Sequence, residues 1–157
     1  IEGKGYTDKL DIFRNLINID SSWKWLIIGE GDFVDSLKKQ VSRYSLNEHV
    51  IFIGSVSRDK LRFFYSLANV FWMLSNMKES FGLVYKEAQL CGCPTIGRNC
   101  FGVKEVIKHK KNGFLVDNNS EVINAIDYLM SDEFFYENND DKNNGIRLTE
   151  LVSEKYI

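Results

Sequence analysis

The chain has 157 residues, of which 44% are hydrophobic and 13% aromatic, values typical of one folded domain rather than of a disordered protein. A formal net charge of −2 excludes the overall positive field that draws many proteins to nucleic acid or acidic lipid. No apolar run reaches the roughly 18 residues that a membrane-spanning helix needs. The three cysteines, an odd number in apolar surroundings, favour reduced thiols, so we expect a cytoplasmic protein.

Short apolar runs alternate with amphipathic stretches along the chain. The apolar runs predict strands at 25–28, 50–53, 70–74, 95–97 and 113–116. The amphipathic stretches predict helices at 8–19, 33–44, 57–67, 83–90, 103–107, 120–130 and 146–155, with a polar loop at 137–145. Ser57 and Ser120 are candidate helix caps. Strands separated by helices predict a three-layer α/β, Rossmann-like domain with a mostly parallel sheet.

Ligands of such sheets bind at the carboxyl ends of the strands, near the point where the strand order reverses. Three loops follow strands at that edge, at 29–32, 54–57 and 75–82. We therefore look for binding residues in these loops and in the first turns of the helices that follow them.

The segment from Glu79 to Glu87 follows a predicted strand and opens a predicted helix. The free N–H groups of a helix start suit a diphosphate, and Gly82 would let it approach without a Cβ in the way. Glu79 could accept hydrogen bonds from sugar hydroxyls, and Glu87 from a ribose. Spacing alone slightly favours the alternative that both glutamates are exposed residues on a helix surface. Cys91, Cys93 and His109 have the wrong number and spacing for a convincing metal site.

The run from Leu74 to Gly97 closely resembles the signature of the family 4 retaining glycosyltransferases of the GT-B fold. In that signature two glutamates are separated by seven residues, within Glu-x-Phe-Gly-Leu and followed by Glu-Ala-x-x-x-Gly-x-Pro. Weaker matches extend the likeness over roughly residues 3 to 118: Lys4-Gly5, Gly29-Glu-Gly31, Phe52-Ile-Gly-Ser-Val56 and Asn112-Gly-Phe-Leu-Val116.

The resemblance implies that the chain is the C-terminal half of a GT-B fold and binds a nucleotide-diphosphate sugar. It implies a catalytic contact of Glu79 with the donor sugar and a contact of Glu87 with the ribose. The complete set of implied donor-binding residues is Lys4, Val56, Arg58, Ser80, Phe81, Gly82, Leu83 and Glu87.

Two segments depart from the family pattern. The arginine that usually precedes the phosphate-binding lysine by several positions would lie before Ile1. The usual Gly-Gly-x-Pro-Glu segment appears as Phe101-Gly-Val-Lys-Glu105, without its first glycine and its proline. The shape of that loop is therefore left open by the resemblance.

The function implied is retaining transfer of a sugar to a glycan or lipid-linked acceptor in cell-envelope polysaccharide or glycoconjugate synthesis. The donor is a substrate, and neither a cofactor nor a metal is expected. Residues 1–157 would form the donor-binding domain, and the N-terminal acceptor domain would be absent. Contact with the cytoplasmic face of a membrane would be peripheral and made through that domain. We expect the chain alone to bind nucleotide and to transfer sugar poorly.

Two other functions remain open. The first is a nucleotide-sugar epimerase of the same fold, which would lack the paired glutamates. The second is a non-catalytic nucleotide-sugar-binding module. A dinucleotide-binding domain is disfavoured because the segment from Gly29 to Val34 lacks the third glycine of Gly-x-Gly-x-x-Gly.

Overall fold

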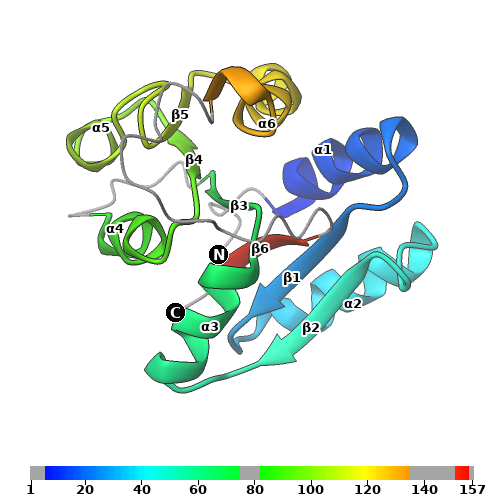
Figure 1. Cartoon of the computed structure of the whole chain (residues 1–157). Coiled ribbons are helices and arrows are strands. Elements are labelled where there is room, and N and C mark those ends of the chain that lie inside the picture. The colour runs from blue at the N-terminus through cyan, green and yellow to red at the C-terminus, as the bar shows by residue number, and fades with distance from the viewer. Residues whose placement is uncertain (1–5, 75–81, 135–150, 156–157) are drawn as a thin grey trace.

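The computed structural model describes residues 6–74, 82–134 and 151–155 (Figure 1). Its strands are β1 (Lys24–Ile28), β2 (Val50–Gly54), β3 (Val70–Met73), β4 (Thr95–Arg98), β5 (Gly113–Val116) and β6 (Leu151–Lys155). Its helices are α1 (Tyr6–Ile19), α2 (Phe33–Arg43), α3 (Arg58–Leu67), α4 (Leu83–Leu90), α5 (Val103–Val106) and α6 (Val122–Leu129), with a 3-10 turn, η2 (Asn119–Glu121). The strands predicted from the apolar runs, and the helices predicted up to residue 130, are confirmed to within about two residues at each end.

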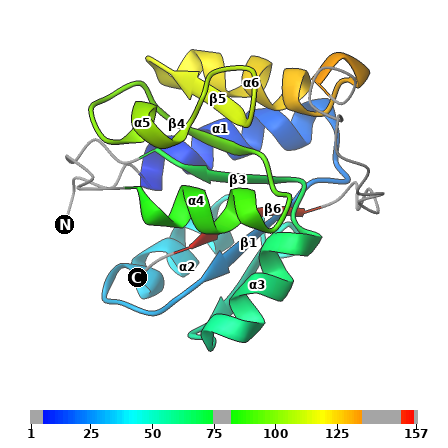
Figure 2. The same ribbon diagram turned by 60° about the vertical axis from the view of Figure 1, so that its left-hand side comes forward.

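The strands form one sheet in the order β2-β1-β6-β3-β4-β5, and all of the pairs are parallel. One core cluster joins the sheet to α1, α2 and α6, and a second joins its other face to α3, α4 and α5 (Figures 1 and 2). β3 illustrates the division, because Val70 and Trp72 belong to the first cluster and Phe71 to the second. The predicted three-layer α/β, Rossmann-like architecture is therefore confirmed.

The tryptophans Trp23, Trp25 and Trp72 all belong to the larger core. Trp25 of β1 and Trp72 of β3 are both fully buried. Their ring centroids lie 5.3 Å apart, with an interplanar angle of 69°. Phe13 of α1 packs on Trp25, with 5.5 Å between the centroids. These aromatic contacts hold α1 against the middle of the sheet.

The predicted C-terminal helix is wrong over the part that the structure describes. Residues 151–155 form strand β6, which pairs with β1 through Lys24 and Leu151 and with β3 through Val70 and Val152. Backbone pairing with two neighbours outweighs a local helix propensity that is weak in so short a segment. Residues 146–150 and the predicted loop at 137–145 lie outside the described residues.

The capping hydrogen bonds at two helix starts differ from those predicted. Ser57 does occupy the N-cap position of α3, with an extended backbone, but its side chain makes no capping hydrogen bond. Ahead of α6 the chain makes the η2 turn, and the side chain of Asn118 accepts from the N–H of Ser120 at 3.0 Å. Asn118, rather than Ser120, is therefore the capping residue.

Candidate functional site

The loops after β1 and β2 meet at the carboxyl edge of the sheet, as predicted. The N–H of Gly29 donates to the carbonyl oxygen of Gly54 at 2.9 Å. The N–H of Ser55 lies 3.5 Å from a carboxylate oxygen of Glu30, a long hydrogen bond. Gly54 has a φ of +77°, a left-handed conformation that favours glycine and turns the chain from β2 toward α3.

Helix α4 begins at the same edge, directly after Gly82. Gly82 is its N-cap residue and has a φ of +55°, and the N–H of Tyr85 donates to its carbonyl oxygen at 3.0 Å. A Cβ at this position would lie only 3.0 Å from the ring of Tyr85, so the backbone conformation and the lack of space both favour glycine. The first N–H groups of an α-helix have no partner within it, so Gly82 and Leu83 place a helix N-terminus, with its partial positive charge, at the predicted edge.

Four of the predicted site residues have no described position. Lys4, Glu79, Ser80 and Phe81 lie outside the described residues. Their assigned contacts with phosphate and with the donor sugar therefore remain predictions from the sequence.

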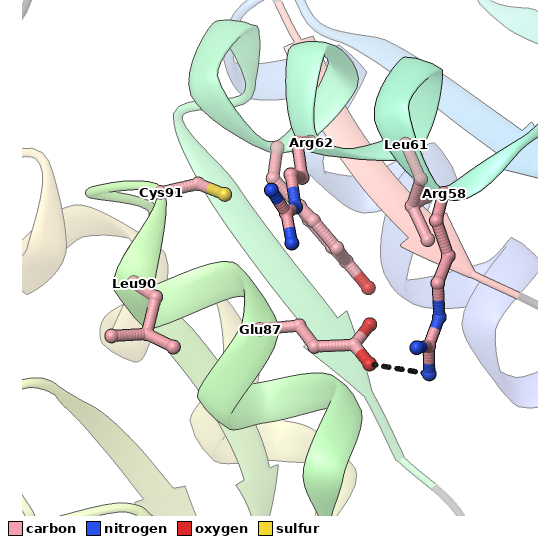
Figure 3. A pocket seen from close by; sticks show the side chains of 7 residues that line it. Arg58, Leu61, Arg62, Glu87, Leu90 and Cys91 are labelled. Carbon is pink, nitrogen blue, oxygen red and sulfur yellow. Dashed lines mark ion pairs between the residues drawn. The ribbon is translucent and has the colours of Figure 1, made fainter.

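A pocket of about 300 Å³ lies between α3 and α4 (Figure 3). Its lining residues come from these two helices and the turn after α4, and are Arg58, Leu61, Arg62, Tyr65, Glu87, Leu90 and Cys91. Figure 3 shows the side chains of Arg58 and Glu87 pointing toward one another from opposite helices. A guanidinium nitrogen of Arg58 lies 3.9 Å from a carboxylate oxygen of Glu87, which makes a long ion pair. The structure thus brings two of the predicted donor-binding residues together in one pocket.

Val56 does not line this pocket. It is half-buried and packs against the core cluster beneath α3 and α4. Its predicted contact with the donor therefore stays a prediction from the sequence.

Tyr65, Arg62 and Cys91 are pocket residues that the sequence did not identify. Tyr65 lies on the apolar face that the residue spacing predicts for the helix at 57–67, and that pattern assigns it no binding role. Its spacing from Arg58 and Arg62, seven and three residues, puts all three on one side of α3, and Cys91 follows Glu87 by one helical turn. That spacing could have identified them once Arg58 and Glu87 were placed at the site.

Burial raises the pKa of two groups in this pocket. The pKa of the Tyr65 phenol is raised far above its ordinary value, first by burial and then by the neighbouring Glu87 carboxylate. Burial also raises the pKa of the Cys91 thiol, against a smaller opposing effect of Arg62. Both groups are therefore uncharged at neutral pH.

Metal-binding and membrane-spanning features are both lacking from the parts of the chain that the structure describes. Within residues 6–74, 82–134 and 151–155, no three His, Cys, Asp or Glu side chains gather in a way that could hold a metal ion. None of the helices in these ranges is both long and apolar enough to cross a membrane.

The sequence model of the family described as "Glycosyl transferases group 1" matches residues 1–147. The chain belongs to this family. An N-acetyl-alpha-D-glucosaminyl L-malate synthase of Bacillus anthracis is 30% identical over 156 residues, which are 98% of this chain and 38% of that protein. A GDP-mannose-dependent alpha-(1-6)-phosphatidylinositol monomannoside mannosyltransferase of Mycobacterium tuberculosis is 33% identical over 115 residues, 68% of this chain and 30% of that protein.

Solved structures give the same fold. Anabaena HepE in complex with UDP and glucose superposes with a TM-score of 0.71 at 27% identity, over 84% of this chain and 36% of that one. The C-terminal domain of LpcC, a glycosyl transferase group 1 family protein of Francisella tularensis, gives a TM-score of 0.73 at 24% identity, over 87% of this chain and 74% of that one. The predicted relation to the C-terminal half of a GT-B fold is thereby confirmed.

This chain spans well under half the length of the curated relatives that it matches, for example 42% of a Haemophilus influenzae glycosyltransferase and 38% of the Bacillus anthracis synthase. Those two proteins are more than twice as long as this chain.

Proposed function

We propose that this chain is the donor-binding domain of a glycosyltransferase and holds a nucleotide-diphosphate sugar at the carboxyl edge of its sheet. The observation that carries the proposal is the pairing of Arg58 with Glu87 across the pocket between α3 and α4. Arg58, Glu87 and the N-terminus of α4 lie at this edge. In our proposal they contact the base, the ribose and the diphosphate of such a donor, in that order. The complex of HepE with UDP and glucose supports this class of ligand.

Each part of the donor has its own binding residues in this proposal. Glu87 accepts hydrogen bonds from the ribose hydroxyls, and Arg58 lies on the side of the base, with Val56 supporting the turn. The amides from Ser80 to Leu83 bind the diphosphate together with Lys4. Glu79 contacts the donor sugar and acts as the catalytic residue.

The diphosphate gains negative charge as the bond to the sugar breaks. Helix N–H groups and a lysine are preorganised to stabilise that charge, and each such donor can lower the barrier by ~3 kcal/mol. No metal is required for this stabilisation. We propose that the sugar leaves and the acceptor attacks on the same face, so that the anomeric configuration is retained.

We propose that the acceptor binds to a part of the protein other than this donor-binding domain. In our proposal an N-terminal acceptor domain faces the carboxyl edge of this sheet and completes the active site. The names of the relatives, among them the mycobacterial phosphatidylinositol monomannoside mannosyltransferase, support a glycan or lipid-linked acceptor of the cell envelope. Contact with the cytoplasmic face of the membrane would then be peripheral and would belong to that domain.

A thermal-unfolding screen of the 157-residue chain against UDP-, GDP- and ADP-glucose tests the donor proposal. The matching donor, at about 100 times its dissociation constant, should add ~2.7 kcal/mol to the free energy of unfolding. Glu87→Ala should remove most of this gain. Glu48→Ala, which removes an exposed carboxylate from the turn before β2, is the matched control and should keep it. If none of the three donors stabilises the chain at millimolar concentration, the proposal is wrong.

The Glu79→Ala variant distinguishes a role in catalysis from a role in binding. It is made in the protein that includes the acceptor domain. We expect sugar transfer to fall by about a hundredfold or more while the nucleotide dissociation constant changes little. Unchanged transfer would exclude Glu79 as the catalytic residue. If no transfer can be measured for the parent protein either, the chain is a nucleotide-sugar-binding module.

A further inference from the structure

Tyr65 lines the α3–α4 pocket and is 2% exposed, and its hydroxyl has no hydrogen-bond partner in the described part of the chain. Tyr85 is as deeply buried, yet its hydroxyl donates to the carbonyl oxygen of Met73 at 2.7 Å. The two rings pack on Phe71, with centroids 5.4 and 5.8 Å from it. Their apolar environments are therefore alike, and of the two only Tyr65 keeps a buried hydroxyl unsatisfied, which native folds rarely do without a reason.

Glu87 lines the same pocket as this hydroxyl and is the carboxylate that acts on it electrostatically, while Arg58 and Arg62 are the cations of the pocket. Burial and the Glu87 carboxylate together raise the pKa of Tyr65, so the phenol stays protonated and acts as a donor. The ion pair of Glu87 with Arg58 is long, at 3.9 Å, and the Arg58 side chain is 87% exposed. An ion pair of this length, with one partner so exposed, contributes little to the orientation of either side chain.

We propose that Tyr65 is a positioning residue for Glu87 in the nucleotide site. When a nucleotide binds, the Tyr65 hydroxyl donates to one carboxylate oxygen of Glu87 and leaves the other to accept from the ribose. A carboxylate has enough lone pairs for both contacts, and a hydrogen bond to a charged group is stronger than a neutral one. This inference rests on the proposed function, because it assumes that Glu87 binds a ribose.

The test is a double-mutant cycle on nucleotide affinity. Titration calorimetry with UDP, GDP and ADP first identifies the ligand that binds most tightly. Its dissociation constant is then measured for the parent chain, Tyr65→Phe, Glu87→Ala and the double variant. We expect Tyr65→Phe to weaken binding about five- to tenfold in the parent chain and not at all in the Glu87→Ala background. The 2′,3′-dideoxy form of the same ligand should bind equally well to the parent chain and to Tyr65→Phe.

Tyr85→Phe is the matched control. It also removes one buried hydroxyl beside Phe71, but that hydroxyl has a backbone partner. We expect it to lower the unfolding temperature without any ribose-dependent change in affinity. Tyr65→Phe should unfold at or above the temperature of the parent chain, since it removes an unsatisfied group.

Several results would overturn the inference. One is an unchanged nucleotide affinity of Tyr65→Phe. Another is a loss of affinity on Tyr65→Phe that is the same in the parent chain and in the Glu87→Ala background, because Tyr65 would then act independently of Glu87. A marked drop in unfolding temperature for Tyr65→Phe would show that its hydroxyl is already partnered in the free protein. If Glu87→Ala weakens binding and Tyr65→Phe does not, only this inference fails. If the parent chain binds no nucleoside diphosphate, the proposed function fails with it.

Discussion

At the scale of single residues, Tyr65 and Tyr85 show why the candidate site was only partly predictable. Apolar periodicity placed Tyr65 on the buried face of its helix, and the structure confirms that it is buried. Periodicity predicts that the ring is buried, however, and does not predict the hydrogen-bond partner of the hydroxyl oxygen. The neighbouring elements decide whether this hydroxyl donates to a carbonyl oxygen, as in Tyr85, or lines a pocket, as in Tyr65. Arg58 was identified only because a resemblance to a known family assigned a role to its position, whereas Gly82 and Glu87 also lie at the predicted start of a helix after a strand.

Gly113 offers a prediction at the same scale. A Cβ on this first residue of β5 would overlap the backbone carbonyl oxygen of Thr95 in the neighbouring strand β4. Because a strand backbone cannot move aside as a side chain can, Gly113→Ala should lower the free energy of unfolding by about 3 kcal/mol. Urea denaturation followed by tryptophan fluorescence measures this change.

The matched control is Gly92→Ala in the turn after α4. Gly92 has a φ of +78°, and no atom lies within 4 Å of the place that an added methyl group would take, so only backbone strain is added there. That strain should cost about 1 kcal/mol. Equal losses at the two glycines would show that the contact with Thr95 is relieved by movement of the strands.

At the scale of elements, the start of α3 and the start of the η2 turn ahead of α6 differ in a way that the sequence did not predict. Serine favours the N-cap position, yet the side chain of Ser57 makes no capping hydrogen bond and that of Asn118 does. Asn118→Ala should therefore lower the free energy of unfolding by ~1 kcal/mol, and Ser57→Ala by much less. Thermal or urea unfolding of both variants provides the comparison, and a larger loss for Ser57→Ala would contradict it.

Strand β6 marks the limit of prediction for an element. Leu151 to Lys155 is too short for its periodicity to distinguish strand from helix, and its assignment depends on partners far away in the sequence, such as Val70 for Val152. The other strands are apolar runs bounded by turn residues, and both features can be read from the local sequence. Local features therefore predicted five strands and their order along the chain, whereas the order across the sheet had to come from the structure.

At the scale of the whole molecule, the three cysteines report on different events. Cys93 is 1% exposed, and burial raises the pKa of its thiol, which therefore stays protonated and unreactive at neutral pH. Iodoacetamide should modify Cys93 only when the whole domain unfolds, so its labelling rate should follow the free energy of unfolding measured in urea. Mass spectrometry of tryptic peptides gives the rate at each cysteine.

The same labelling experiment tests the pocket. Cys91 lines it and is partly exposed, and Cys100 is partly exposed elsewhere. A bound nucleotide should slow labelling of Cys91 and leave Cys100 unchanged. Because burial raises the pKa of Cys91, less of its thiolate is present at a given pH, and its labelling should need a higher pH than that of a free thiol. Protection of Cys100 alone would place the nucleotide outside the α3–α4 pocket.

The contact between Trp25 and Trp72 has an optical consequence. Two indoles 5.3 Å apart and inclined at 69° couple their electronic transitions, so the native protein should show an exciton couplet in its far-ultraviolet circular dichroism. One ring comes from β1 and the other from β3, strands that are joined through β6. The couplet should therefore appear only when the two halves of the sheet have come together. The protein thus carries an intrinsic chromophore pair that reports when these two parts of the sheet assemble.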